Sequence, residues 1–280
     1  MLTLVAKVLL ETLQITLLVA VMMIAVDLLN VWTKERITSL VQGRRHCRQY
    51  VLSSLIGSFP GCIGGFTNVS LYMHGLISFG ALSGSMIAVS GDEAFVMLAM
   101  FPQQALILFA VLFVLGVGGG WLIDVAVKRF RIKTCENCGE MVTHSSERNL
   151  LHYVKVHIYG HILKRHLWKV ALWTFGALSV TEIGLQYLHL QEFTSEYKIV
   201  FLLVAALVGL IPESGPHLIF VTLFAQGLIP FSILLTSSIV QDGHGMLPLL
   251  SFSLKDSMKI KFFNLGLGLA VGVLLFAAGY

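Results

Sequence analysis

The sequence predicts an all-α membrane protein of about ten transmembrane or re-entrant segments, arranged as a five-plus-five inverted repeat with broken helices. Three observations support this fold class. The 280 residues are 56% hydrophobic and only 12% charged, whereas soluble domains carry about 25% charged residues. The apolar runs are continuous rather than alternating, which favours helices over strands. Finally, a stretch of 44 residues occurs twice, 152 positions apart.

The repeat places residues 55–98 on residues 207–250 without a gap, and 14 of the 44 aligned positions are identical. Chance similarity between apolar segments is one interpretation. Duplication is the other, and it is the usual ancestry of secondary transporters. The matched prolines and glycines favour duplication because they repeat the breaks in the apolar runs; they include Gly57/Gly209, Pro60/Pro212, Gly75/Gly227 and Gly91/Gly243.

In the first half, the apolar pieces of the repeated unit are shorter than the roughly 20 residues that a membrane span needs. They therefore predict kinked helices or re-entrant half-helices. Basic residues before and after them indicate cytoplasmic segments by the positive-inside rule. In order, we expect a span at Leu4–Trp32, a basic loop or surface helix at Lys34–Tyr50, short pieces at Val51–Phe59, Ile63–Met73, Leu76–Val89 and Ala94–Phe101, and a span at Ala105–Val127.

A polar segment divides the chain into a first membrane repeat (1–133), a cytoplasmic loop (134–166) and a second membrane repeat (167–280). Each half consists of one helix, three segments formed by the pieces of the broken unit, and a closing helix. Five segments is an odd number, so the second half should enter the membrane inverted, with both termini outside the cytoplasm. In the second half we expect a span at Lys169–Leu190, the broken unit within Ile199–Leu250, a cytoplasmic turn marked by Lys255, Lys259 and Lys261, and a last span at Phe262–Tyr280.

The broken units carry acids and histidines, which a membrane tolerates only where they face protein or a water-filled cavity. In an inverted repeat the two units meet near the midplane. Carboxylates with imidazoles suit Mn²⁺, Fe²⁺ or Zn²⁺, and oxygen ligands alone would also suit Mg²⁺ or Ca²⁺. Alternatively, some of these groups cap half-helices. The candidate ligands are Asp92, Glu93, Glu213, His217, Asp242, His244, Asn68 and His74, with Asp27 and Glu182 as candidate coupling residues.

An oxyanion is the rival substrate, because half-helix N-termini and hydroxyl groups can bind one. The first broken unit argues against it. Several acids and no Lys or Arg lie between Val51 and Val127, and a carboxylate-rich site repels phosphate or arsenate. The charges therefore favour a cation or a neutral solute.

The central loop contains a possible zinc site. Its sequence CENCG places two thiols on a tight turn, and histidines follow at intervals close to those of a zinc finger. The candidate ligands are Cys135, Cys138, His152 and His157. A basic linker with a free Cys pair is the alternative.

The segments GSFPGC (57–62), GLISFGALSGSMIAVSGDEAF (75–95), GLIPESGPH (209–217) and GLIPFSILLTSSIVQDGHGMLPLL (227–250) resemble a family of bacterial ten-helix heavy-metal exporters, labelled arsenic-efflux or manganese-transport proteins. The CENCG loop is similar too. The resemblance covers most of the chain and implies efflux of a metal or metalloid.

Together these patterns predict a multi-pass inner-membrane transporter that exports a divalent metal by alternating access, with proton coupling. An arsenic-type metalloid or oxyanion exporter, or an intramembrane metal-dependent enzyme built on Glu213 and His217, is the alternative. The sequence has no nucleotide-binding signature, and no nucleic-acid partner is expected. A homodimer is possible through the glycines at 116–120 and 266–268, which could equally pack helices internally.

Overall fold

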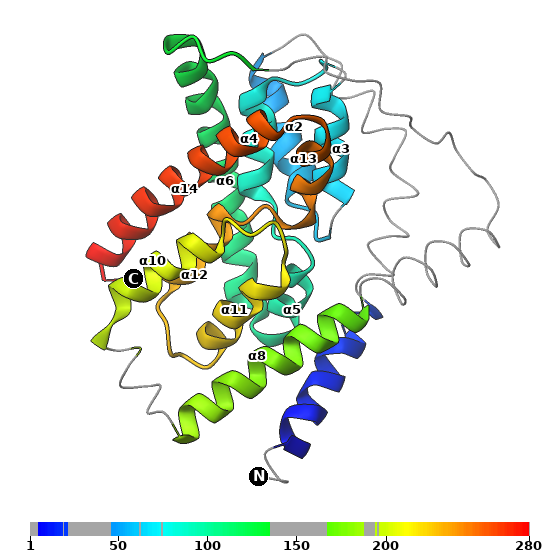
Figure 1. Cartoon of the computed structure of the whole chain (residues 1–280), viewed down its shortest axis with the longest axis vertical. Coiled ribbons are helices and arrows are strands. Elements are labelled where there is room, and N and C mark those ends of the chain that lie inside the picture. The colour runs from blue at the N-terminus through cyan, green and yellow to red at the C-terminus, as the bar shows by residue number, and fades with distance from the viewer. Residues whose placement is uncertain are drawn as a thin grey trace, which may run out of the picture.

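The computed structural model describes residues 5–18, 20–21, 46–61, 63–73, 75–134, 167–187, 194 and 196–279. These residues form helices and no strand (Figure 1), which confirms the all-α prediction. Residues 5–18 and 20–21 are helical. The labelled helices are α2 (His46–Gly57), α3 (Ile63–Met73), α4 (Phe79–Ala88), α5 (Glu93–Met100), α6 (Pro102–Arg129), α8 (Trp168–Tyr187), α10 (Lys198–Val208), α11 (Leu218–Ala225), α12 (Phe231–Val240), α13 (Met246–Phe252) and α14 (Leu254–Ala277), with short 3₁₀ helices η2 (Gly215–His217) and η3 (Gly243–Gly245).

The helices of the two halves recur at the spacing of the sequence repeat. Adding 152 to the bounds of α4 gives the bounds of α12, and adding it to α3 gives residues 215–225, which are η2 and α11. The backbone agrees as well. Gly75 and Gly227 both have positive φ angles, 69° and 71°, in the turns that precede α4 and α12. The repeat thus extends from sequence to structure.

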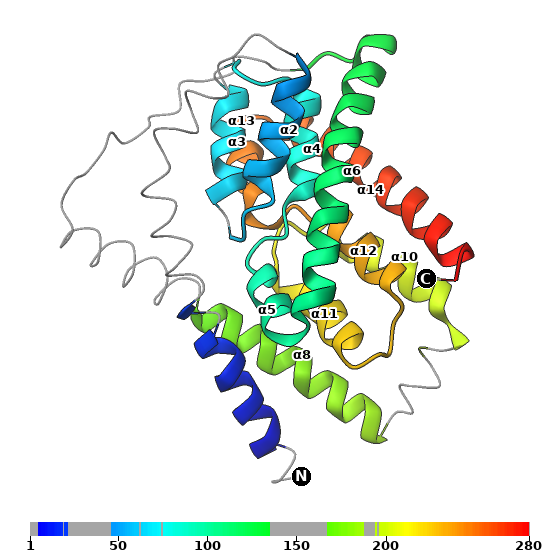
Figure 2. The same cartoon turned by 180° about the vertical axis from the view of Figure 1, so that it is seen from behind.

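The two halves pack against each other through equivalent helices. Helix α3 of the first half contacts α13 of the second, and α5 of the first half contacts α11 of the second. Under the repeat, α3 corresponds to α11 and α5 to α13, so the two contacts are copies of each other. Figures 1 and 2 show both pairs side by side from opposite directions. Reciprocal contacts of this kind are the mark of two-fold symmetry.

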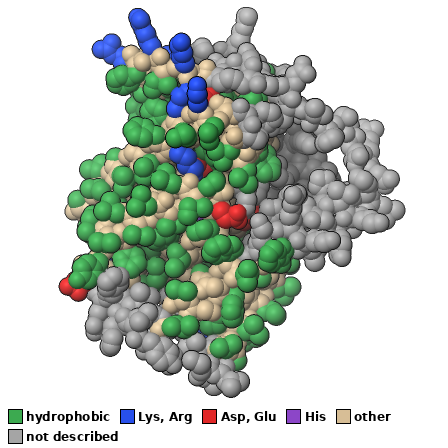
Figure 3. Space-filling model, viewed as in Figure 1, with side chains coloured by type: hydrophobic (Ala, Val, Ile, Leu, Met, Phe, Trp, Pro, Cys, Tyr) green, Lys and Arg blue, Asp and Glu red, His purple; other side chains and the backbone are tan. Residues whose placement is uncertain are grey.

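The long helices α6 and α14 cross at a wide angle. Helix α6 rises towards its C-terminal end at the top of the molecule, and α14 begins in the same upper part and slants downward (Figures 1 and 2). Lys and Arg side chains gather at the top, and hydrophobic side chains dominate the described surface below them (Figure 3). Exposed basic residues close α6 and follow it: Lys128, Arg129, Arg131 and Lys133.

Glycines let the long helices approach the repeated units closely. A Cβ on Gly116 of α6 would lie 2.5 Å from the carbonyl oxygen of Gly84 in α4. In the second half, a Cβ on Gly268 of α14 would lie 2.6 Å from the side chain of Val240 in α12. These glycines therefore pack helices within the chain, whereas an added Cβ on Gly266 would meet no atom within 4 Å.

Three stretches of the described residues are long and apolar enough to cross a membrane: Phe79–Met100, Pro102–Arg129 and Leu254–Ala277. The short pieces of the first half fall close to the predicted bounds. Helix α2 begins at His46, within the segment predicted as a basic loop or surface helix. One prediction is wrong: Lys255, Lys259 and Lys261 lie in helix α14 rather than in a turn.

Candidate functional site

The two broken units meet at two glycine turns. Gly91 and Gly243 have φ angles of 56° and 51°, a left-handed conformation that residues with a Cβ rarely adopt. The turns lie against each other, because a Cβ on Gly243 would be 3.4 Å from the Cα of Gly91. The N–H of Gly61 donates to the carbonyl of Gly91 at 3.1 Å. Three breaks between α-helices therefore converge at this point, which we call the glycine crossing.

Helices α4 and α12 end just before the crossing. Val89 and Gln241, the residues that follow them, are extended, with ψ angles of 131° and 138°. An extended residue cannot continue the helical hydrogen bonds, so its carbonyl needs another partner. The side-chain Nε2 of Gln241 donates to the carbonyl of Val89 at 3.2 Å. This buried bond joins the second half to the first at the crossing.

Four buried side-chain oxygens on residues beside the two glycine turns have neither a hydrogen bond nor an ion pair with the described residues. A Cβ on Gly91 would lie 2.7 Å from one of them, the hydroxyl of Ser214. A buried polar atom without a partner costs about 1–3 kcal/mol, and such atoms call for an explanation. Oxygens with free lone pairs are what a bound cation would use. The four are Ser90 Oγ, Glu93 Oε2, Ser214 Oγ and Gln241 Oε1.

Two predicted ligands lie directly after the first glycine turn. Asp92 and Glu93 are 5% and 2% exposed and stand at the N-terminus of α5, where backbone amides favour negative charge. The side chain of Asp92 does not cap this helix. Adjacent buried carboxyl groups can bind a cation, or share a proton because like charges resist a second ionisation. The sequence pattern SGDE thus contributes two acids to the crossing.

Asp242, a predicted ligand, is buried, but both of its carboxylate oxygens already have partners within the protein. Its Oδ2 lies 2.6 Å from Nζ of Lys261, and its Oδ1 accepts a hydrogen bond from Asn264 at 2.8 Å. Both partners come from α14. The sequence predicts Lys261 in a cytoplasmic turn, whereas in the structure its side chain reaches a buried carboxylate.

His217, Glu213 and Asn68 occupy different surroundings. His217 is 1% exposed, and its Nδ1 lies 3.0 Å from the hydroxyl of Ser237, whereas Glu213 is half-buried. The side-chain amide of Asn68 donates to the carbonyls of Ser53 and Gly64 at 3.0 and 3.1 Å. Asn68 therefore ties α3 to α2.

The described residues contain no group of three or more His, Cys, Asp or Glu side chains placed to hold a metal ion. Several predicted ligands lie outside that set. The backbones of His244 and Glu182 are described but their side chains are not. Outside the described residues lie His74, Asp27 and the four candidate zinc ligands Cys135, Cys138, His152 and His157, so the zinc loop stays a prediction.

Sequence reasoning missed a buried acid in α6. Asp124 accepts hydrogen bonds from the hydroxyls of Tyr50 and Ser78, at 2.7 and 2.5 Å, and from the N–H of Gly80 at 2.7 Å. It fixes the start of α4 against α6. A lone acid inside an apolar span is itself the signal that could have found it.

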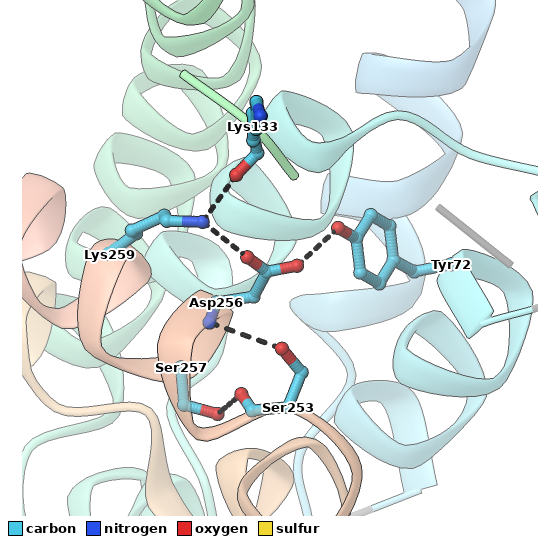
Figure 4. A network of polar contacts seen from close by, with 6 residues as sticks. All are labelled: Tyr72, Lys133, Ser253, Asp256, Ser257 and Lys259. Carbon is cyan, nitrogen blue, oxygen red and sulfur yellow. Dashed lines mark hydrogen bonds and ion pairs between the residues drawn. The ribbon is translucent and has the colours of Figure 1, made fainter. Parts of the chain in front are cut away.

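A second missed network joins the halves at the end rich in Lys and Arg (Figure 4). The hydroxyl of Tyr72, in α3, donates to Asp256 of α14 at 2.8 Å. Nζ of Lys259 donates to Asp256 at 2.7 Å and to the carbonyl of Lys133 at 2.5 Å. Tyr72 and Lys133 belong to the first half, so the network bridges the repeat.

A family described as "Putative, 10TM heavy-metal exporter" matches residues 3–187 and 165–278 of the chain. The two matches together cover nearly the whole sequence, and they confirm the resemblance found in the repeated segments. No curated protein and no solved structure matches the chain.

Proposed function

Because the chain belongs to this family of ten-transmembrane-helix heavy-metal exporters, we propose that it exports a divalent transition-metal cation, with Mn²⁺ as the first candidate. The observation that carries the proposal is the set of four unpartnered oxygens at the glycine crossing. Two of the oxygens belong to each half, so a cation bound there would be held by both.

The ligand chemistry supports the hard end of the transition-metal series. Hydroxyl, amide and carboxylate oxygens suit Mn²⁺, whereas thiolates and imidazoles favour Zn²⁺ or copper. The proposed ligands are Glu93 and Asp92 for charge, with Ser90, Ser214 and Gln241 supplying neutral oxygens. The lysine nearby does not oppose a cation, since Asp242 neutralises Lys261 at 2.6 Å.

We further propose that the repeat is inverted and that the halves alternate access to the crossing. The reciprocal contacts of α3 with α13 and of α5 with α11 support this arrangement, as does the descent of α14 from the part of the molecule to which α6 rises (Figure 1). Site residues at the meeting point of broken helices are characteristic of such transporters. Asp92 and Glu93 are also the proposed proton carriers, and the inner membrane is the proposed location.

The test is transport by the purified protein in sealed vesicles with an imposed pH gradient. We expect saturable accumulation of Mn²⁺ that collapses when the gradient is dissipated, with protein-free vesicles as the control. Zn²⁺, Fe²⁺ and arsenite are tested in parallel. Saturable transport of arsenite without any divalent metal would overturn the cation proposal in favour of metalloid export.

A further inference from the structure

The ammonium group of Lys261 lies within a shell of oxygens. Its Nζ is 2.6 Å from Oδ2 of Asp242, 3.0 Å from the carbonyl of Gly209 and 3.5 Å from the carbonyl of Val240. The carboxylate is fully buried, and Asn264 orients it from the other side. One carboxylate and two carbonyl oxygens are the kind of ligands that a bound cation has, and here the ammonium group of Lys261 lies where such an ion would bind.

The fold builds this shell by bringing helix ends together. Gly209 follows the last residue of α10, and Val240 is the last residue of α12. The final carbonyls of a helix lack partners and carry partial negative charge. A Cβ on Gly209 would lie 2.6 Å from the side chain of Val240, so the absence of a side chain at Gly209 lets the two ends meet. Both carbonyls then point to one ammonium group.

The other half of the molecule folds without this charge pair. The repeat places Asp242 on Ser90, Lys261 on Phe109 and Asn264 on Leu112, yet α4, α6 and the turn between α4 and α5 form there as well. A buried ion pair is weak evidence for stability, because removing two charges from water offsets their attraction. The architecture therefore does not require Asp242 and Lys261, which points to a role besides packing.

We propose that Asp242 and the carbonyls of Gly209 and Val240 form a monovalent-cation site that Lys261 permanently fills as a tethered cation. The protein then carries its own ion at this position and needs no dissolved one. The side chain of Lys261 is 14% exposed, so the site is reachable from the surface of the protein. The inference does not depend on which substrate the glycine crossing binds.

Replacing Lys261 by alanine removes the tethered ion and leaves room for a free one. The test is the melting temperature of the purified full-length protein in ammonium, potassium, sodium or choline chloride at matched concentration. We expect wild type to melt at the same temperature in all four salts. Lys261→Ala should melt lower in choline, which is too large for the site, and should recover saturably in ammonium or another of the small cations.

The double variant Lys261→Ala with Asp242→Asn is the matched control, because it removes the carboxylate as well and should respond to no salt. If Lys261→Ala does not fold, Lys261→Ser replaces it, because its short side chain also removes the charge and leaves room for a free cation. Melting of the single variant at one temperature in all four salts would overturn the proposal. So would an equal salt response of the double variant. Neither result bears on metal transport.

Discussion

Buried acids in this protein fall into two kinds. Asp124 receives three hydrogen bonds, and Asp256 and Asp242 are each paired with a lysine and a further donor. Glu93 differs, because its Oε2 has neither a hydrogen bond nor an ion pair among the described residues, whereas Oδ2 of Asp242 is paired with Lys261. A saturated acid holds helices together, whereas an unsaturated one has capacity for a ligand. This distinction separates the candidate site from the rest of the polar interior.

Asp124→Asn should destabilise the protein. The amide nitrogen of Asn cannot accept a hydrogen bond. Either the hydroxyls of Tyr50 and Ser78 lose their shared acceptor, or the N–H of Gly80 loses its acceptor, at a cost of about 1–3 kcal/mol. Thermal unfolding of the purified protein measures this loss of stability, with the exposed Glu196→Gln as control. Equal melting temperatures for the two variants would contradict the assignment of Asp124 as a structural anchor.

Residue chemistry could be predicted from the sequence in part. The sequence predicts that Asp92 and Glu93 face protein or a water-filled cavity, because acids in an apolar stretch are otherwise not tolerated, and both side chains are buried. The place of Lys261 could not be predicted, because three lysines close together are typical of a cytoplasmic segment. A capping signal was present, since Ser253 accepts a hydrogen bond from the N–H of Asp256 at the start of α14.

At the scale of elements, the repeat and its breaks could be predicted well. Prolines and glycines interrupt the apolar runs, and these interruptions fall where α2, α3, α4 and α5 end. The pairing of helices could not be predicted, because apolar periodicity does not say which face meets which partner. The close approach of α6 to α4 depends on particular glycines, and the sequence does not distinguish these from the exposed glycines of the same helix.

Two glycines of α6 provide a matched pair of variants. Gly116→Ala should be destabilising by about 1–3 kcal/mol, since its Cβ would lie 2.5 Å from the carbonyl of Gly84. Gly118→Ala should be neutral or stabilising by up to about 1 kcal/mol, because its Cβ would meet no atom within 4 Å. A melting temperature of Gly116→Ala equal to or above that of Gly118→Ala would show that α4 and α6 do not pack this way.

The second half allows the same comparison. In α14, Gly268→Ala should be destabilising because the new methyl group would lie 2.6 Å from Val240, whereas Gly266→Ala meets nothing within 4 Å. The chain thus predicts matching outcomes at positions 116 and 268, which are equivalent in the repeat. Thermal unfolding tests both. Loss of stability in Gly266→Ala but not in Gly268→Ala would contradict the packing of α14 on α12.

For the whole molecule, the family match and the all-helical structure establish a multi-pass membrane protein. Sequence alone could propose two related halves, because glycine breaks recur at a constant spacing. It could not show that the halves exchange contacts through α3, α13, α5 and α11, since these contacts join residues far apart in the chain. The orientation of the halves is open to direct measurement.

Gln103 and Lys255 test that orientation. They are equivalent in the repeat, exposed, and near the starts of α6 and α14. In a protein whose native cysteines are replaced by serine, an impermeant thiol reagent should label Gln103→Cys from outside the cell only. Lys255→Cys should be labelled from the cytoplasm only. Labelling of both from one side would indicate a parallel repeat and would exclude the inverted one.

We propose that the metal passes through the glycine crossing. Mn²⁺ uptake into vesicles tests this directly with wild type, Glu93→Gln, Ser214→Ala and the exposed control Glu196→Gln, at equal protein content. We predict that the control transports like wild type and that the two crossing variants lose at least about 10-fold, because even residues that only support metal ligands cost about 10–100-fold when replaced. Wild-type uptake by both crossing variants would contradict the claim and place the metal pathway elsewhere in the protein.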